Sequence, residues 1–300
     1  MTASPSQQPA AGSPPAIPTY DDVLRANVEI HTQLSGAYNE VEPHYRPESR
    51  ARVRGILAPF LVPGADGRPP RVLDLGCGTG FVIDLVKREA RRVVGVDATP
   101  AMLARVDREG GAEVELIEGD TGRVDLPSAS FELATAYSFL DHLFDRRPTY
   151  RTAFRALVPG GTFYADLCPN GYFWDAIRAL PRETPVDPIV QREVDAVHGK
   201  ADEVAREHGV SPEAFTLAEY SKHVLGGFRE DDLRAELLDV GFSEVRFVYH
   251  WFLGQAQLVN DPERPRDRNL EDAARMDAVL QRGLPVTRHL FKYVGFLARK

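Results

Sequence analysis

Three glycines alternate with other residues in the stretch VLDLGCGTGF at residues 72–81, directly after a run of apolar side chains. Gly76, Gly78 and Gly80 carry no Cβ atom, so the backbone can turn sharply there and come close to a ligand. A simple tight turn needs only one or two such glycines. Three of them behind a buried strand that carries Asp74 predict a site for a nucleotide-type ligand.

The spacing of the glycines discriminates between kinds of nucleotide. A dinucleotide loop reads G-x-G-x-x-G, and its third glycine lets the following helix pack closely on the strand. Here the pattern is G-x-G-x-G, and Phe81 occupies the position of a third dinucleotide glycine. The bulky ring disfavours pyrophosphate binding, and the absence of a GxxxxGK[ST] motif excludes a P-loop. The loop therefore suits a nucleoside without phosphate.

Polar residues also end the next two predicted strands. The stretch VVGVDATPAML (93–103) reaches Asp97, whose carboxylate can accept hydrogen bonds from both ribose hydroxyls. The stretch ELIEGDTG (115–122) reaches Asp120, an acceptor for an exocyclic adenine amine. Met102 has a flexible, polarisable side chain that can lie against a purine. Each residue also has a structural explanation, since a strand-end Asp often caps a helix and Met102 can be plain core.

These residues are positioned by alternating strands and helices, which predict an α/β fold. Strands are predicted at residues 71–75, 92–96, 113–118, 131–136, 162–167, 244–252 and 287–298, and helices at 80–90, 100–108, 141–157, 229–242 and near 270–282. The stretch LVPGG (157–161) is predicted to stop a helix, with positive φ at Gly160 and Gly161. This alternation is typical of a doubly wound, mostly parallel, seven-stranded Rossmann-like sheet with helical cap insertions.

The segments outside the sheet divide the chain further. Residues 1–18 are rich in Pro, Ala, Ser and Gln and are predicted to be a disordered tail. The core then comprises residues 19–167 and 227–300, with 19–60 as an N-terminal helical cap. Residues 168–226 carry helical patterns near 189–207 and 212–224 and are predicted to be a lid insertion. Residues 253–285 form a second insertion.

Composition limits the possible partners and the compartment. The net charge of −8 argues against a nucleic-acid or anionic-membrane partner, because both need an excess of Lys and Arg. The chain start lacks the basic and apolar regions of a secretory signal, and no apolar run is long enough for a membrane span. Cys77 and Cys168 alone give no disulfide framework and no metal site. We expect a cytoplasmic protein, monomeric or homodimeric.

Over about residues 37–167 and 228–249 the chain resembles the class I S-adenosylmethionine-dependent methyltransferases, especially their small-molecule branch. The resemblance implies that Asp74 and the backbone of residues 76–80 hold the methionine portion, Asp97 the ribose, and Asp120 with Thr121 the adenine. The implied cofactor set further includes Tyr45, Gly76, Gly78, Gly80, Ala98, Met102 and Tyr137, with Tyr137 and Ser138 facing the sulfonium. The stretch AYNEVEPHYRP (37–47) is similar to the segment that closes over the cofactor. One departure is that residues 253–286 separate the last two strands, which normally form a short hairpin.

The activity implied is methyl transfer to a small organic molecule, a metabolite or natural-product intermediate, by in-line SN2 displacement, with S-adenosylhomocysteine as product. A hydroxyl, phenol or carbon acceptor needs a base, and His142 in YSFLDHL (137–143) is the candidate; its alternative role is to cap or pack a helix. Asp166 either orients substrate or caps a turn. Tyr172 and Trp174 either line the substrate pocket or pack in the interior of the lid. His44 is expected at the surface or at a hinge.

Two other functions remain open from the sequence. A NAD-dependent oxidoreductase would use the same sheet edge, although Phe81 argues against it. A non-catalytic S-adenosylmethionine-binding protein would keep the same site without turnover. The acceptor atom, whether O, N, S or C, is not specified by any residue.

Overall fold

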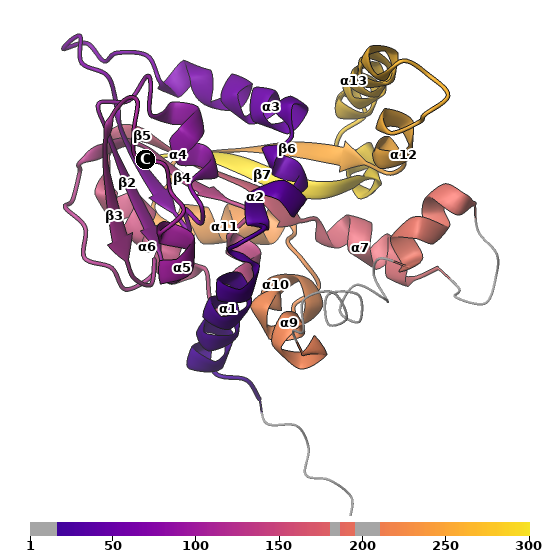
Figure 1. Cartoon of the computed structure of the whole chain (residues 1–300), viewed down its shortest axis with the longest axis horizontal. Helices are drawn as coiled ribbons and strands as arrows, with labels where there is room; N and C mark the ends of the chain where they lie inside the picture. Colours follow the sequence, from indigo (N-terminus) through magenta and orange to yellow (C-terminus); the bar gives the residue numbers. More distant parts are fainter. Residues whose placement is uncertain (1–16, 181–186, 196–210) are drawn as a thin grey trace, which may run out of the picture.

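The computed structural model describes residues 17–180, 187–195 and 211–300, and its centre is a twisted sheet with helices packed on both faces (Figure 1). The seven strands are β1 (Arg71–Leu75), β2 (Arg92–Asp97), β3 (Glu113–Glu118), β4 (Phe131–Tyr137), β5 (Leu157–Pro169), β6 (Glu244–Phe252) and β7 (Phe291–Arg299). Their order is β3-β2-β1-β4-β5-β7-β6, and β7 is antiparallel to both of its neighbours. The predicted fold class is confirmed.

The core has two halves because successive strand residues point to opposite faces of the sheet. Leu73 and Leu75 face the half that includes side chains of α6 (Arg147–Ala156) and α11 (Glu230–Val240). Val72 faces the other half, with side chains of α3 (Pro47–Leu57) and α4 (Phe81–Val86). Both faces of the central strands are thus buried, which places the polar strand ends at the edge of the sheet, where ligands can enter.

Three helices of the core are shorter than predicted. The helix after β1 is α4, the helix after β2 is α5 (Pro100–Leu103), and residues 141–157 split into a 3₁₀ turn, η3 (Leu140–His142), and α6. The split has a local cause, because the Asp145 carboxylate accepts from the Arg147 backbone N–H at 3.0 Å and Pro148 lies in the first turn of α6. His142 therefore lies in a short turn before the helix rather than inside it.

The stretch LVPGG belongs to β5 rather than to a helix stop, since α6 ends at Ala156. Of its two glycines only Gly160 has a positive φ, of 80°. Gly161 is required for a different reason: a Cβ there would lie 3.0 Å from the Val158 carbonyl oxygen. The prediction of two positive-φ glycines was half wrong.

The N-terminal segment, residues 20–60, covers part of the edge formed by the carboxyl ends of the parallel strands. It contains α1 (Tyr20–Leu34), α2 (Tyr38–Val41), η1 (Pro43–Tyr45), α3 and η2 (Ala58–Phe60). Helix α1 begins at a capping box in which the Thr19 side chain accepts from the Asp22 backbone and the Asp22 carboxylate accepts from the Thr19 backbone. Its apolar side chains Ala26 and Ile30 pack on Phe215 of α9 (Pro212–Ala218), so segments far apart in the sequence meet here.

The two insertions flank the ends of β5, β6 and β7 (Figure 1). The first contains α7 (Gly171–Arg178), helical residues 188–195, α9 and α10 (Tyr220–His223); the rest of the helix predicted at 189–207 lies outside the described residues. The second contains α12 (Gln255–Val259) and α13 (Arg266–Arg282), and η4 (Val286–Leu290) follows it. Strands β6 and β7 pair in register despite this long connection, so only the start of the last strand, predicted at 287, was wrong. Within the described parts of the chain, no helix is both long and apolar enough to span a bilayer.

Candidate functional site

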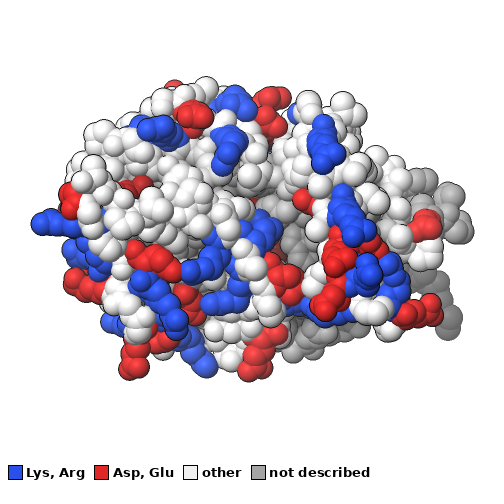
Figure 2. Space-filling model, turned by 90° about the horizontal axis from the view of Figure 1, so that it is seen from above, with Lys and Arg blue, Asp and Glu red and all other residues white. Residues whose placement is uncertain are grey.

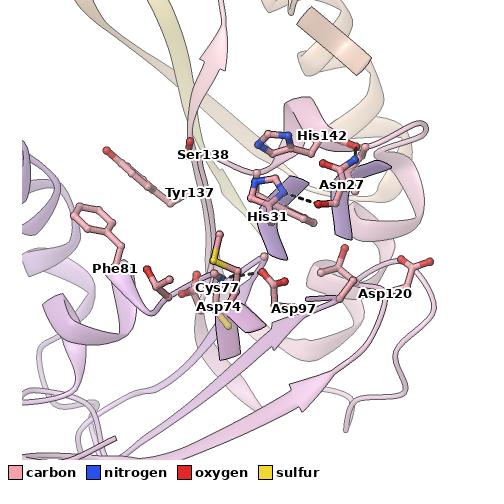
Figure 3. Close-up of a pocket in the computed structure, with 18 of the residues that line it drawn as sticks. Asn27, His31, Asp74, Cys77, Phe81, Asp97, Asp120, Tyr137, Ser138 and His142 are labelled. Carbon is pink, nitrogen blue, oxygen red and sulfur yellow. Dashed lines mark hydrogen bonds between the residues drawn. The ribbon is translucent and has the colours of Figure 1, made fainter. Parts of the chain in front are cut away.

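A pocket with about 930 Å³ of empty space lies at the carboxyl ends of β1, β2 and β4, and α1 covers it (Figure 3). Residues predicted to contact a nucleoside cofactor line it: Tyr45, Asp74, Gly76, Gly78, Asp97, Ala98, Met102, Asp120, Thr121 and Tyr137. Gly80 does not line the pocket but ends the loop as the N-cap of α4, with a φ of 92°. The sequence motifs are thus brought together around one cavity.

The loop formed by residues 76–80, the glycine loop, requires its glycines for different reasons. Gly76 has a φ of 71°, and a Cβ there would lie 2.1 Å from the Phe139 ring. Gly78 has a φ of 53°, and a Cβ there would meet no atom within 4 Å. Because Gly78 also lines the pocket, the space above its backbone is free for a ligand. Gly76 is therefore needed for packing and Gly78 for close approach.

Asp97 braces the glycine loop from the end of β2. Its Oδ2 accepts from the Gly78 backbone N–H at 2.9 Å and its Oδ1 from the Thr99 N–H at 2.8 Å. Each carboxylate oxygen has a second lone pair, so the turn-capping role and the predicted ligand role are compatible. Burial raises the pKa of the Asp97 carboxyl.

Asp74 lies beneath the glycine loop and is nearly inaccessible to solvent. The Thr135 hydroxyl donates to its Oδ1 at 2.7 Å. Burial raises the pKa of the Asp74 carboxyl to about 7, and the nearby Asp97 adds to the shift although the Thr135 hydrogen bond opposes it. A cationic group in the pocket would favour the ionised form of this carboxyl.

At the end of β3, Asp120 holds the start of α1. The Tyr20 hydroxyl donates to Asp120 Oδ2, and the Gly122 backbone N–H donates to Oδ1 at 2.9 Å. The Arg123 guanidinium lies over the Tyr20 ring, 4.3 Å from its centroid. Asp120 therefore also closes the pocket, a role that the sequence did not suggest.

The charge and shape of the pocket fit a nucleoside without phosphate. Among the described residues, no Lys or Arg lines the pocket, whereas three carboxylates do. A phosphate would be bound by cations or by a free helix N-terminus, and Phe81 occupies the start of α4. A positively charged thioether on an adenosine fits this set of donors and acceptors.

Four aromatic rings, those of His44, Tyr45, Phe81 and Tyr137, form one wall of the pocket, here called the aromatic wall. Figure 3 shows two of them, Phe81 and Tyr137, on the same side of the pocket. The Phe81 ring centroid lies 4.7 Å from that of Tyr137 and 4.9 Å from that of His44. The Tyr45 hydroxyl lies 2.5 Å from Thr79 Oγ1 in the glycine loop. His44 was expected at the surface, but only 6% of it is exposed, because η1 turns it toward the sheet.

Because His44 is buried, the stability of the folded chain depends on pH. Burial lowers the pKa of the His44 imidazole to about 4 from 6.5, and the Glu42 carboxylate 3.6 Å from Nδ1 does not reverse this. Between these two values the unfolded chain binds a proton that the folded chain excludes, so stability is complete above pH 6.5 and falls as the pH drops.

We expect wild-type protein to lose more stability between pH 7 and pH 5 than His44→Phe, by on the order of 1 kcal/mol. Phenylalanine retains the ring contacts but does not titrate. Urea unfolding at both pH values measures the difference, and an equal loss in the two proteins would show that His44 is not buried in its neutral form.

His142, the candidate base, lies in η3 with its ring against the pocket. Its Nδ1 lies 2.6 Å from the Ala218 carbonyl oxygen, which can only accept, so Nδ1 carries the proton. Burial acts to lower the pKa of His142, but Asp141, Glu219 and this hydrogen bond outweigh it and raise the pKa. The ring stands edge-on to that of His31 on α1, with centroids 4.9 Å apart.

Asp166 does not line the pocket; it is fully buried behind it. Its carboxylate lies 2.9 Å from Arg52 Nη1 and 2.9 Å from His250 Nε2, and accepts from the Tyr164 hydroxyl. The nearby His250 ring and the Arg52 guanidinium lower the pKa of Asp166 although burial opposes this, while burial lowers the pKa of His250 itself and favours its neutral form. Arg52 Nη2 in turn lies 3.4 Å from the Tyr137 hydroxyl, which connects this network to the aromatic wall.

The other two predicted substrate residues lie on α7, apart from the pocket. The Arg288 guanidinium stacks over the Tyr172 ring at 3.8 Å. Trp174 is buried in a cluster with Phe173, Ile177 and Val194. A role for either in binding substrate stays a prediction.

Sequence reasoning missed the face of α1 that covers the pocket. Tyr20, Val23, Leu24, Asn27 and His31 all line it, at the spacing of one helix face. The sequence predicted only that residues 19–60 form a helical cap, because helical spacing does not show what a helix face covers.

Comparison with known proteins identifies relatives over the core of the chain. Residues 73–165 match the family described as "Methyltransferase domain". A Mycolicibacterium smegmatis protein named "Probable S-adenosylmethionine-dependent methyltransferase" is 36% identical over 42% of this chain and 46% of its own length. A ubiquinone biosynthesis O-methyltransferase from Erwinia tasmaniensis is 28% identical over 51% of this chain and 65% of its own length. The chain therefore spans less than two thirds of either relative.

A solved structure supports the fold alone. The phosphoethanolamine N-methyltransferase 2 of Haemonchus contortus, in complex with S-adenosyl-L-methionine, superposes with a TM-score of 0.55 at 14% identity, covering 96% of this chain and 61% of that one.

Proposed function

We propose that this chain, which contains a methyltransferase domain of the class I S-adenosylmethionine-dependent type, transfers a methyl group from S-adenosylmethionine to a small organic molecule. The observation that carries the proposal is the pocket itself: a glycine loop braced by Asp97, carboxylates in place of cations, and an aromatic wall. Such a pocket suits a cationic nucleoside and disfavours a diphosphate.

The chain's own residues would hold the cofactor by its separate parts. Asp97 would accept from the ribose, Asp120 and Thr121 would face the adenine, and Met102 would lie against the base. Asp74 and the backbone of Gly78 would hold the methionine portion. The cofactor supplies a methyl group that its sulfonium has already activated, so the protein mainly orients the reactants and excludes water.

The aromatic wall and His142 would serve the acceptor. Tyr137 lies at the end of β4, where the acceptor would meet the methyl group, and its hydroxyl is oriented by Arg52. Because Nδ1 of neutral His142 donates to Ala218, its Nε2 carries the lone pair and can accept a proton from a hydroxyl acceptor. The segment at 168–226 would act as the lid over that acceptor, with Asp166 as a positioning residue.

The surface charge and the relatives both support a small-molecule acceptor. Acidic and basic side chains are interspersed over the face shown in Figure 2, which does not resemble a basic platform for nucleic acid. The O-methyltransferase named among the relatives acts in ubiquinone biosynthesis, which favours a small aromatic or hydroxylated acceptor here. We place this activity in the cytoplasm.

Labelled methyl transfer into fractionated small-molecule extracts tests the function. Purified chain with methyl-labelled S-adenosylmethionine should label a compound of low molecular mass, and the same extract without protein should not. Cofactor binding without label in any fraction would favour a non-catalytic binding protein.

A substitution in the glycine loop tests the close approach of the cofactor. We expect Gly78→Ala to weaken S-adenosylhomocysteine binding at least tenfold, about 1.4 kcal/mol, because the new Cβ enters the pocket. Gly67→Ala is the matched control, since Gly67 also has a positive φ, of 72°, and open space around it but lies outside the pocket.

Both variants should lose about 1 kcal/mol of stability from the left-handed backbone. Calorimetric titration measures the affinities. Equal affinities in the two variants would mean that the ligand does not approach residue 78.

A further inference from the structure

Asn27 contributes an unsatisfied polar atom to the pocket. The residue lies midway along α1, and Figure 3 shows it with His31 across the cavity from Asp97 and Asp120. Its Oδ1 is buried and has no hydrogen-bond partner within the described structure. A buried acceptor without a donor is unfavourable, so an unpaired oxygen on a residue that lines a cavity calls for a donor from a ligand or a water molecule.

The orientation of this amide is fixed by chemistry. Asn27 Nδ2 donates to the Val23 carbonyl oxygen at 2.9 Å and to the His142 carbonyl oxygen at 2.8 Å. Both partners can only accept, so the nitrogen must face them and the oxygen must face the other way. The two hydrogen bonds also hold the side chain still, which makes Oδ1 a positioned acceptor rather than a mobile one.

The location of α1 indicates which part of a ligand would reach Asn27. Two turns before it on the same face, Tyr20 binds Asp120 at the adenine end of the proposed site. Helix α1 also packs against α5, which directly follows Asp97 at the ribose position. The adenosine carries three hydrogen-bond donor groups that point away from its rings: the exocyclic amine and the two ribose hydroxyls.

We propose that Asn27 Oδ1 accepts a hydrogen bond from the adenosine part of the cofactor, an inference that rests on the proposed function. The cofactor then contacts both the sheet edge and the helix that covers it. Since α1 packs on α9 through Ala26, Ile30 and Phe215, binding also stabilises the contact between the N-terminal segment and the insertion. Asn27 is a cofactor-binding residue from outside the glycine loop and the strand ends.

The test removes the acceptor on the protein, Asn27, and each candidate donor on the adenosine in turn. Adenosine, purine riboside, 2′-deoxyadenosine and 3′-deoxyadenosine are titrated into wild-type chain and Asn27→Ala. We expect wild type to prefer adenosine about five- to tenfold over one analogue that lacks the donor. In Asn27→Ala that preference should fall by about threefold or more, and the remainder is due to the contacts proposed for Asp97, Asp120 and Thr121. Any general loosening of α1 weakens all four ligands equally.

Glu29→Ala, on the exposed face of the same helix, is the matched control and should keep the wild-type preference. A preference that is as large in Asn27→Ala as in wild type, or wild type that distinguishes none of the analogues, would overturn the inference. Failure of the proposed function is a separate result: wild type would then bind neither adenosine nor S-adenosylhomocysteine.

Discussion

Asp166→Asn is expected to lower the free energy of unfolding by about 3 kcal/mol. Asparagine keeps the size of the side chain but removes its charge. The Arg52 guanidinium, whose side chain is only 28% exposed, would then lack its counter-ion, and the Tyr164 hydroxyl would lose a charged acceptor. A buried charge without a partner is unfavourable because the solvent cannot replace the lost interaction.

Glu115→Gln is the control for this substitution. Glu115 of β3 also forms an ion pair with an arginine, Arg92 of β2, but 43% of its side chain is exposed. We expect that change to alter stability by less than about 1 kcal/mol, as for surface ion pairs in general. Urea unfolding at pH 7 measures both. Similar small effects for the two variants would show that Asp166 is not ionised in a buried network.

Asp97→Ala is expected to weaken S-adenosylhomocysteine binding by one to two orders of magnitude, about 1.5–3 kcal/mol. The substitution removes the acceptor proposed for the ribose and also frees the Gly78 N–H, whose hydrogen bond to Asp97 holds the glycine loop. The two losses act on the same ligand, so the effect should lie toward the upper part of this range.

Glu118→Ala is the matched control for Asp97→Ala. Glu118 is the strand neighbour of Asp97 at the end of β3, but it is exposed and outside the pocket. The affinity of Glu118→Ala for S-adenosylhomocysteine should match that of wild type within about twofold, or roughly 0.4 kcal/mol. If Asp97→Ala bound as tightly as Glu118→Ala, the ribose assignment would be wrong.

The sheet and the glycine loop could be predicted because their signals are local. Strand β1 has the predicted bounds because a short apolar run between turn residues indicates a buried strand. Strand β3 also has them, because Glu residues alternate there with apolar residues, as in a half-buried strand. The glycine spacing likewise reports a backbone requirement of its own segment, as the positive φ angles of Gly76, Gly78 and Gly80 show. Helix ends were less predictable, because Asp145 and Pro148 set the start of α6 through a side-chain hydrogen bond and a fixed φ.

The remainder of the site depends on contacts between distant segments. Tyr20 meets Asp120 and Asn27 meets His142 because α1 folds back over the sheet, and no local pattern specifies that contact. His44 was misplaced for the same reason: the charged Glu42 and Arg46 lie near it in the sequence, but Phe81 and Tyr137 surround it in space. Asp166 similarly finds its counter-ion in Arg52, which lies far from it in the sequence.

Calorimetric titration of the purified chain with S-adenosylmethionine, S-adenosylhomocysteine and NAD tests the central claim most directly. The phosphate-free, acidic pocket predicts saturable 1:1 binding of the first two ligands at micromolar concentration, and no binding of NAD. Binding of NAD alone, or no heat with either sulfur nucleoside at millimolar concentration, would contradict the account.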